Sequence, residues 1–226
     1  MRVSSGKQPF GRTILAIGAA LSLLCLASPA AAATLTLSDG ADNTLTDNPM
    51  FPIWMQPGNL IIGNSPGTNF HAFMEFDVSP LAALGAPGDI MVSSAILTVR
   101  LGQFNINNNM LLTQVRGYVG DGLVEFADLA GPTTLLDTYV FDYNQSPYSA
   151  DVTDFLQQIL DNDDPHLGIH LRRDTLGVSG NYGILRFGQT NEPQIAVTYS
   201  VVPEPASSAL LGLGIAALAA RRRRRP

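Results

Sequence analysis

Thiol chemistry is nearly absent from this sequence, which has one cysteine, Cys25, among 226 residues. Cys25 lies in the apolar segment of residues 14–26, near the N-terminus. If that segment is removed, the mature chain has no thiol. Disulfides, thiolate zinc sites and cysteine nucleophiles are then excluded together.

Positive charge is scarce between the two ends of the chain. The sequence has 13 Lys and Arg against 19 Asp and Glu, and a formal net charge of −6. Eight of the basic residues lie before residue 13 or after residue 220, whereas every acidic residue lies between Asp39 and Glu204. We exclude nucleic acid as a partner, because binding it requires Lys and Arg to neutralise phosphates. The interior holds no lysine and these arginines: Arg100, Arg116, Arg172, Arg173 and Arg186.

Common catalytic motifs are also missing. The sequence has no Gly-x-Ser-x-Gly elbow, phosphate loop or dinucleotide-binding fingerprint. His166 and His170 have the spacing of a helical zinc pair, but the glutamate of the metalloprotease motif is absent. A catalytic zinc usually has three protein ligands, and nothing in the sequence brings His71 near this pair. We interpret the histidines as surface residues and predict no catalytic residues.

The N-terminal residues 1–33 have the pattern of a secretory signal peptide. Arg2, Lys7 and Arg12 precede the apolar segment, and small residues follow it at positions 30–33. The pattern predicts export through the inner membrane and cleavage by signal peptidase after Ala33.

Residues 202–226 have three parts in a fixed order. Val202, Pro203, Glu204 and Pro205 precede an apolar stretch at 206–220. As a helix, this stretch would be about 22 Å long, shorter than the ~30 Å hydrocarbon core. Bilayer thinning and arginine side chains that reach the interface can make up the difference. Five arginines keep the C-terminus on the cytoplasmic side by the positive-inside rule: Arg221, Arg222, Arg223, Arg224 and Arg225.

This tail resembles the PEP-CTERM sorting signal of Gram-negative bacteria. The shared features are Pro203-Glu204-Pro205, the glycines Gly212 and Gly214 in the apolar stretch, and the arginine cluster. The resemblance implies recognition by a membrane-embedded exosortase, cleavage near the motif, and transfer to the cell surface or extracellular matrix. The protein would be anchored transiently in the inner membrane through residues 206–220. The alternative is a plain tail anchor.

The domain at residues 34–201 shows repeated strand-like alternation. Ala72, Met74, Phe76 and Val78 alternate with Phe73, Glu75 and Asp77, and later segments repeat this period of two. One stretch, residues 152–160, has helical spacing, with Asp151 or Thr153 as its cap. The pattern predicts an all-β fold: a jelly-roll-like antiparallel β-sandwich with one short helix, flanked by the signal peptide and the transmembrane sorting helix.

Seven segments of the domain follow one another in a recognisable order: residues 42–45, 73–81, 94–99, 115–122, 151–155, 168–172 and 193–199. This order resembles the DNRLRE-type domain, a jelly-roll module related to a carbohydrate-binding family. The arginine that often precedes the Phe-Asp-Val-Ser strand of such domains is absent, and His71-Ala72 stands there. The resemblance implies a jelly-roll fold and allows polysaccharide binding, without implying catalysis.

Pairs of carboxylates raise the alternative of a glycosidase, which needs two at a defined separation with different pKa values. We interpret them as solvated side chains, because acidic residues are mostly exposed. The pairs are Glu75 with Asp77, Asp121 with Glu125, and Asp151 with Asp154.

Oxygen-rich stretches are candidates for a structural calcium site, since calcium takes six to eight oxygen ligands. The first candidate comprises Asp39, Asp42, Asn43 and Asp47, and the second is residues 161–164. Asp and Asn clusters are equally common in turns. No other cofactor is expected.

Five aromatic residues are candidates for stacking on sugar rings or for positions in the core. They are Phe51, Trp54, Tyr118, Tyr143 and Tyr148.

These patterns together predict an exported, exosortase-processed protein of the cell surface or extracellular matrix. The expected role of its β-sandwich is structural or adhesive, with exopolysaccharide as a candidate partner and no catalysis. The alternative function is a secreted polysaccharide hydrolase or lyase that uses carboxylates.

Overall fold

The computed structural model describes residues 31–48, 59–65, 68–100, 103–105, 110–142, 147–174, 182–186 and 192–202. Within it, Ala32–Val202 form one compact unit. The strands are β1 (Ala33–Thr46), β2 (Asn59–Ser65), β3 (Thr68–Asp77), β4 (Ile90–Val99), β5 (Gln103–Asn105), β6 (Met110–Gly120), β7 (Thr134–Asp142), β8 (Tyr148–Asp151), β9 (His166–Arg173), β10 (Tyr182–Arg186) and β11 (Gln194–Val201). The helices are α2 (Ser79–Ala82), α3 (Thr153–Asp161) and the 3-10 turn η1 (Phe126–Leu129).

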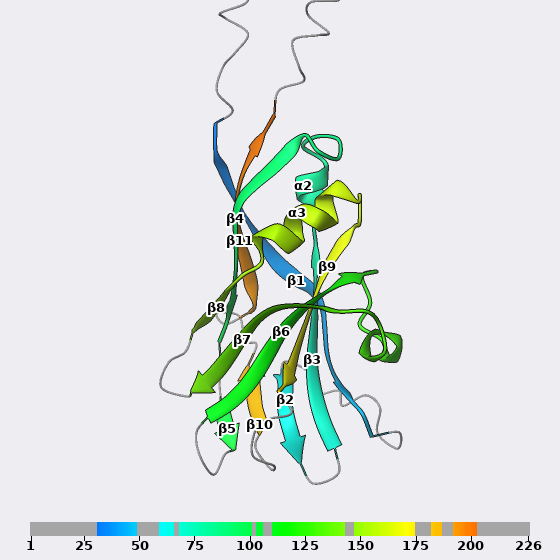
Figure 1. The fold of residues 1–226 in the computed structure, drawn as a ribbon, viewed down its shortest axis with the longest axis vertical. Helices are drawn as coiled ribbons and strands as arrows, with labels where there is room; N and C mark the ends of the chain where they lie inside the picture. The colour runs from blue at the N-terminus through cyan, green and yellow to red at the C-terminus, as the bar shows by residue number, and fades with distance from the viewer. Residues whose placement is uncertain are drawn as a thin grey trace, which may run out of the picture. The chain divides into compact units, whose positions relative to one another are not determined.

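The described strands form two antiparallel layers that β1 connects (Figure 1). Residues 33–38 of β1 pair with β11, which continues through β4 to β8. Residues 39–46 pair with β3. From β3 the layer continues in two directions. One series runs through β9 and β6 to β7, and the other runs through β2 and β10 to β5. The pairing is irregular between Asp39 and Ala41, where β1 passes from one layer to the other. The predicted all-β antiparallel sandwich is therefore confirmed.

The alternation in the sequence gives the core. Ala72, Met74 and Phe76 of β3 are fully buried between the layers, together with Ala95 and Leu97 of β4. Successive strand residues point to opposite faces, so these positions fill the interior while their neighbours face outward.

Helix α3 covers one part of this core beside β4, as Figure 1 shows. Its apolar residues Phe155, Leu156, Ile159 and Leu160 are buried, as their spacing predicts. Gln157 ties the helix to β4: its Oε1 accepts from the Val92 N–H at 2.8 Å and its Nε2 donates to the Ile90 carbonyl at 3.0 Å.

The start of α3 differs from the expectation. Its N-cap is Val152, and no side chain caps the helix. Asp151 instead accepts bonds from the N–H and hydroxyl of Thr153, at 2.9 and 2.5 Å, while the Ala95 N–H donates to the Thr153 hydroxyl at 2.8 Å. The two polar side chains that predicted a cap therefore fix the connection between β8, α3 and β4.

The four-residue helix α2 was not predicted. Asp77 initiates it, because its Oδ1 accepts from the N–H and hydroxyl of Ser79 at 2.8 and 2.5 Å. These bonds also lower the pKa of Asp77. Leu81 of this helix is fully buried in the core.

The two chain ends of the described unit leave from adjacent strands at the same end of the sandwich (Figure 1). Ala33 pairs with Tyr199, and the Val202 N–H donates to the Asp89 carbonyl at 2.6 Å. Cleavage after Ala33 would remove only the first residue of β1. In the part of the chain that the structure describes, no helix is long and apolar enough to span a membrane. Residues 206–220, for which the sequence predicts the sorting helix, lie outside that part.

Candidate functional site

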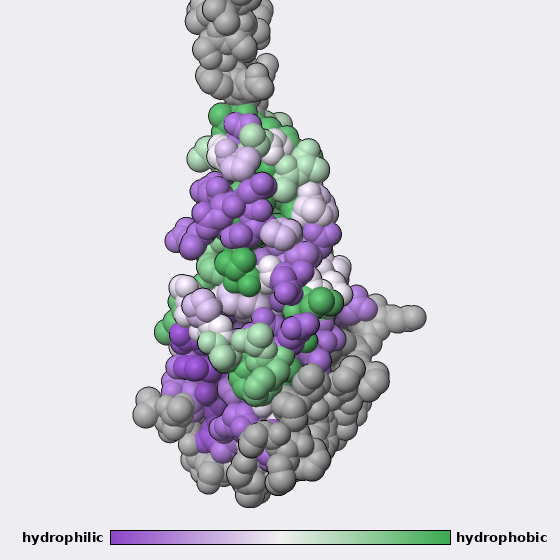
Figure 2. All heavy atoms as spheres, turned by 90° about the vertical axis from the view of Figure 1, so that its right-hand side faces the viewer, coloured by the Kyte–Doolittle hydropathy of each residue, from purple (hydrophilic) through white to green (hydrophobic). Residues whose placement is uncertain are grey.

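Exposed apolar side chains are scattered over the described surface. Figure 2 shows hydrophobic and hydrophilic residues intermixed on one face. Met91, Leu123 and Leu135 are each more than half exposed, at 58%, 60% and 51%. Leu135 differs from the other two because it lines a cleft.

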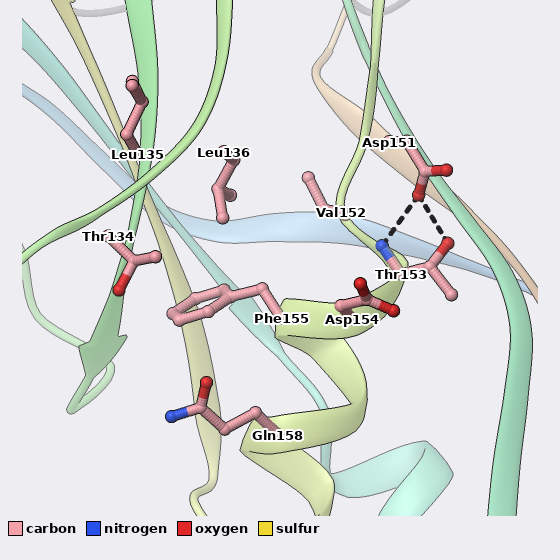
Figure 3. A pocket seen from close by; sticks show the side chains of 9 residues that line it. All are labelled: Thr134, Leu135, Leu136, Asp151, Val152, Thr153, Asp154, Phe155 and Gln158. Atoms are coloured by element: carbon pink, nitrogen blue, oxygen red, sulfur yellow. Dashed lines mark hydrogen bonds between the residues drawn. The ribbon is translucent and has the colours of Figure 1, made fainter.

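The cleft lies between the start of β7 and the first turns of α3, and has a volume of about 330 Å³. Figure 3 shows Leu135 and Leu136 on one side and the α3 residues on the other, with the Phe155 ring between them. Its size is at the lower end of the range for small-ligand sites. It is lined by Thr134, Leu135, Leu136, Asp151, Val152, Thr153, Asp154, Phe155 and Gln158.

Two polar side chains of the cleft are free to meet a ligand. Asp154 and Gln158 are exposed, and neither side chain makes a hydrogen bond to another described residue. They lie four residues apart and so share one face of α3. A carboxylate and an amide, opposite the apolar Leu135, supply both the acceptors and the donors that sugar hydroxyls require.

The second carboxylate of the cleft has a structural role. Asp151 is engaged by Thr153, and these hydrogen bonds lower the pKa of Asp151. It therefore stays ionised at neutral pH and is a poor general acid. A glycosidase needs one carboxyl group with a raised pKa.

Two residues of β6, Arg116 and Gly117, contact the segments on either side of the cleft. Arg116 donates from Nε to the Thr133 hydroxyl at 2.6 Å and from its guanidinium to the Thr133 carbonyl at 3.1 Å, just before β7 begins. Gly117 leaves room for the Phe155 ring, since a Cβ at this position would lie 2.5 Å from the ring. Strand β6 therefore lies against both sides of the cleft, at Thr133 and at Phe155.

The outward face of β3, β9 and β6 carries a second group of polar residues. Antiparallel pairing places side chains from the three strands in rows across the sheet. One row is His71, Arg172 and Gln114, and the next is Phe73, His170 and Arg116.

His71 and His170 contact each other directly, with His71 Nδ1 3.0 Å from His170 Nε2. His170 is 3% exposed and stacks on Phe73, with ring centroids 4.1 Å apart. Burial lowers the pKa of His71 to about 4, and burial with the neighbouring His71, Arg172 and Arg116 lowers that of His170 to about 2. Both imidazoles are neutral at pH 7. The expectation that the histidines are ordinary surface residues is wrong for His170, and the third histidine, His166, lies two rows away.

Arg116 and Arg172 share one neutral acceptor. Gln114 Oε1 accepts from Arg172 Nε at 2.9 Å and from Arg116 at 3.1 Å. Among the described residues, neither guanidinium forms an ion pair with a carboxylate. Burial and the charge of Arg172 lower the pKa of Arg116. We call Arg116, Arg172, Gln114, His71 and His170 the Arg–His cluster.

Glu75 is buried, which contradicts its interpretation as a solvated carboxylate. It is 1% exposed and accepts from the Tyr118 hydroxyl at 3.0 Å and the Gly122 N–H at 2.6 Å. Burial raises its pKa. The segment around η1 covers this face: Val124 and Leu129 pack against Phe73 and Tyr118. Alternation correctly assigns Glu75 to the outward face of the sheet. It could not show that this face is covered, because the covering segment lies some fifty residues later in the sequence.

Asp121 and Glu125 shape the turn that leads into η1. Asp121 accepts from the Leu123 N–H at 3.0 Å, and Glu125 forms a capping box with Asp128. These carboxylates therefore have local structural roles.

Two of the calcium candidates at residues 39–47 are engaged in hydrogen bonds within the protein. Asn43 Oδ1 accepts from the Thr44 N–H at 2.9 Å, and Asp47 accepts from the N–H of Asn69 at 2.7 Å and from its side-chain amide. Burial, with Asp42 and Glu192 nearby, raises the pKa of Asp39 to about 6. Within the described ranges, no three His, Cys, Asp or Glu side chains are grouped as a metal site requires. Calcium binding gains no support and stays a prediction.

Of the aromatic candidates, Tyr118 and Tyr148 are in the core, at 5% and 8% exposure. Phe51, Trp54 and Tyr143 lie outside the described residues. So do Pro203, Glu204, Pro205 and the terminal arginines.

The end of β11 continues directly into the predicted sorting tail, since the last sheet residue is Val201 and Val202 follows it. Residues 201–225 match the PEP-CTERM protein-sorting motif. The PEP-CTERM motif implies an exported protein that is anchored in the membrane and then processed by an exosortase. No curated protein matches the chain.

Proposed function

We propose that the processed protein resides at the cell surface or in the extracellular matrix, where its β-sandwich binds polysaccharide without turning it over. The proposal includes the resemblance of residues 39–200 to the DNRLRE-type, carbohydrate-binding-module-like domain. The observation that carries it is the cleft between β7 and α3, with its exposed Leu135 and the free Asp154 and Gln158. Sugars present hydroxyl groups beside apolar C–H surfaces, and this lining offers partners for both.

The chain ends support an adhesive role. Both leave from one end of the sandwich, whereas the Arg–His cluster lies near Leu45, at the end of β1 remote from Ala33. A domain held by its C-terminal end can therefore present its other surfaces to a matrix.

The test is binding and turnover by the exported, processed protein on a glycan array, with reducing-sugar and unsaturation assays on every glycan bound. Binding without turnover supports the proposal. Turnover that is lost when Asp154 is replaced by Asn supports instead the alternative of a polysaccharide hydrolase or lyase.

The cleft is tested with a matched pair of leucines. Leu135→Ser removes exposed apolar surface inside the cleft, and Leu123→Ser removes a similarly exposed leucine outside it. Loss of one leucine contact is worth roughly 1–1.5 kcal/mol, which corresponds to about five- to tenfold in affinity. Equal effects of the two variants would place binding elsewhere. Gln158→Ala removes a free amide from the cleft and is expected to weaken binding about as much as Leu135→Ser does.

A further inference from the structure

The Arg–His cluster concentrates the rare positive charge of the domain. Only five basic residues lie between the two ends of the chain, and two of them, Arg116 and Arg172, meet on the outward face of β6 and β9. Both donate to the same oxygen of Gln114. Two like charges on one neutral acceptor repel each other, and an anion between them would relieve that repulsion.

Arg172 retains most of its hydrogen-bonding capacity. A guanidinium has five N–H donors, and within the described part of the chain only Nε of Arg172 has a partner. Its two terminal nitrogens are free to make a bidentate contact, for which the planar guanidinium matches a carboxylate or sulfate. The residue is half-buried, and the bond from its Nε to Gln114 holds the guanidinium in place.

The neighbouring histidine pair adds one neutral N–H donor, because two neutral imidazoles have two N–H groups and one of them is used between the rings. The contact between His71 and His170 uses one nitrogen of each ring, and the buried Nδ1 of His170 has no hydrogen-bond partner. A described carboxylate, Asp47, is close enough to raise the pKa of His71, but it is bonded to Asn69 and to neither arginine. The cluster therefore lacks a counter-ion among the described residues.

We propose that the Arg–His cluster is an oxyanion site, in which Arg172 binds the carboxylate or sulfate groups of an acidic extracellular polysaccharide. Gln114 holds the Arg172 guanidinium, and Arg116 in turn holds Gln114. No residue of the cluster lines the cleft between β7 and α3. The site gives an otherwise acidic domain an affinity for acidic polymers. This proposal rests on the proposed surface location and adds the ligand class.

The probe is polygalacturonate, with fully methyl-esterified polygalacturonate as the uncharged partner of the same chain. Affinity electrophoresis and calorimetry of the exported, processed protein should show binding to the acid form that weakens steeply with salt. The ester is expected to bind at least tenfold more weakly. Equal affinity for the two forms would overturn the proposal, as would binding to phosphatidylglycerol vesicles without binding to polygalacturonate.

The variants separate charge from position. Arg172→Gln is expected to lose at least tenfold in affinity for polygalacturonate, and Arg172→Lys several-fold, because an ammonium cannot form the bidentate contact. Arg173→Gln, which removes the same charge from the adjacent residue on the opposite face of β9, should change it less than threefold. Equal losses in the Arg172→Gln and Arg173→Gln variants would contradict a defined site. Unchanged melting temperatures show that each variant is folded.

A second readout does not depend on mutation. Addition of polygalacturonate to the wild-type protein should shift the imidazole NMR signals of His71 and His170, and leave that of His166 unchanged. Unmoved signals at saturating polymer would overturn the site. The Leu135→Ser variant distinguishes the two proposals: it should lose affinity for glycans bound in the cleft and keep its affinity for polygalacturonate.

Discussion

His71 on β3 and His170 on β9 lie 3.0 Å apart through Nδ1 and Nε2, and the His170 ring stacks on Phe73. Each histidine is beside an arginine of the cluster, and burial keeps both imidazoles neutral. The pair therefore links the stability of the sheet to pH.

The first prediction concerns this link. The pKa values of His71 and His170, about 4 and about 2, lie below the unfolded value of 6.5. Between these values the unfolded chain binds protons that the folded chain does not, so the histidines make the protein less stable as pH falls from 6.5. Each contributes at most about 1.4 kcal/mol per pH unit. Urea unfolding from pH 7 to 4.5 measures the unfolding free energy of wild type and of the His71→Gln variant. This free energy should fall less steeply with falling pH in the variant. Equal dependence on pH in the two proteins would contradict the prediction.

Asp39 acts in the opposite direction. Its pKa of about 6 is above the ordinary value of 3.8, so the folded chain binds the extra proton and Asp39 makes the protein less stable as pH rises from about 4 to 6. Asp39→Asn should unfold at higher urea than wild type at pH 7.5, and the difference should disappear at pH 4. Asp163→Asn, at an exposed turn, is the charge-matched control against which the Asp39→Asn variant is compared. An advantage of Asp39→Asn that persists at pH 4 would contradict this origin.

The buried Glu75 predicts two graded losses of stability. Tyr118→Phe removes one hydrogen bond to Glu75 and should cost about 1 kcal/mol of unfolding free energy. Glu75→Ala leaves both the Tyr118 hydroxyl and the Gly122 N–H without this acceptor and should cost more, about 2–4 kcal/mol. Chemical denaturation measures both. A Glu75→Ala variant as stable as wild type would show that the carboxylate is not needed to hold the segment around η1.

Close packing predicts which glycines tolerate a methyl group. A Cβ on Gly168 would lie 2.4 Å from the Tyr118 ring, so Gly168→Ala should cost about 1–3 kcal/mol by overpacking. A Cβ on Gly40 would meet nothing closer than 3.8 Å, so Gly40→Ala should be neutral or slightly stabilising. Thermal melts of the two variants test the difference, and equal shifts would contradict it.

The sorting tail gives a prediction in the cell. Replacement of Pro203-Glu204-Pro205 by alanines should leave the protein uncleaved and membrane-bound in a host with an exosortase, as followed by a C-terminal epitope tag. Replacement of Ser207-Ser208 by alanines in the same tail is the control. Unchanged processing of the first variant would show that the exosortase does not recognise Pro203-Glu204-Pro205.

The sequence by itself determined the features that depend on local pattern. Alternation in β3 and β4 specified which residues face the core, because successive strand side chains point to opposite faces. Helical spacing placed α3, and the order of motif, apolar stretch and arginines specified the sorting tail. The cleft was only partly predicted. The sequence made Asp151 and Asp154 candidates, but it did not indicate that residues of β7 line the same cleft.

Only the tertiary structure decided which residues meet across strands. His71 and His170 are 99 residues apart, and their contact follows from the register of β3 with β9. Arg116 joins them through the register of β9 with β6. The burial of Glu75 likewise depends on a distant segment that covers its face. Long-range register sets these contacts because backbone pairing, and not the local sequence, determines which side chains stand opposite each other.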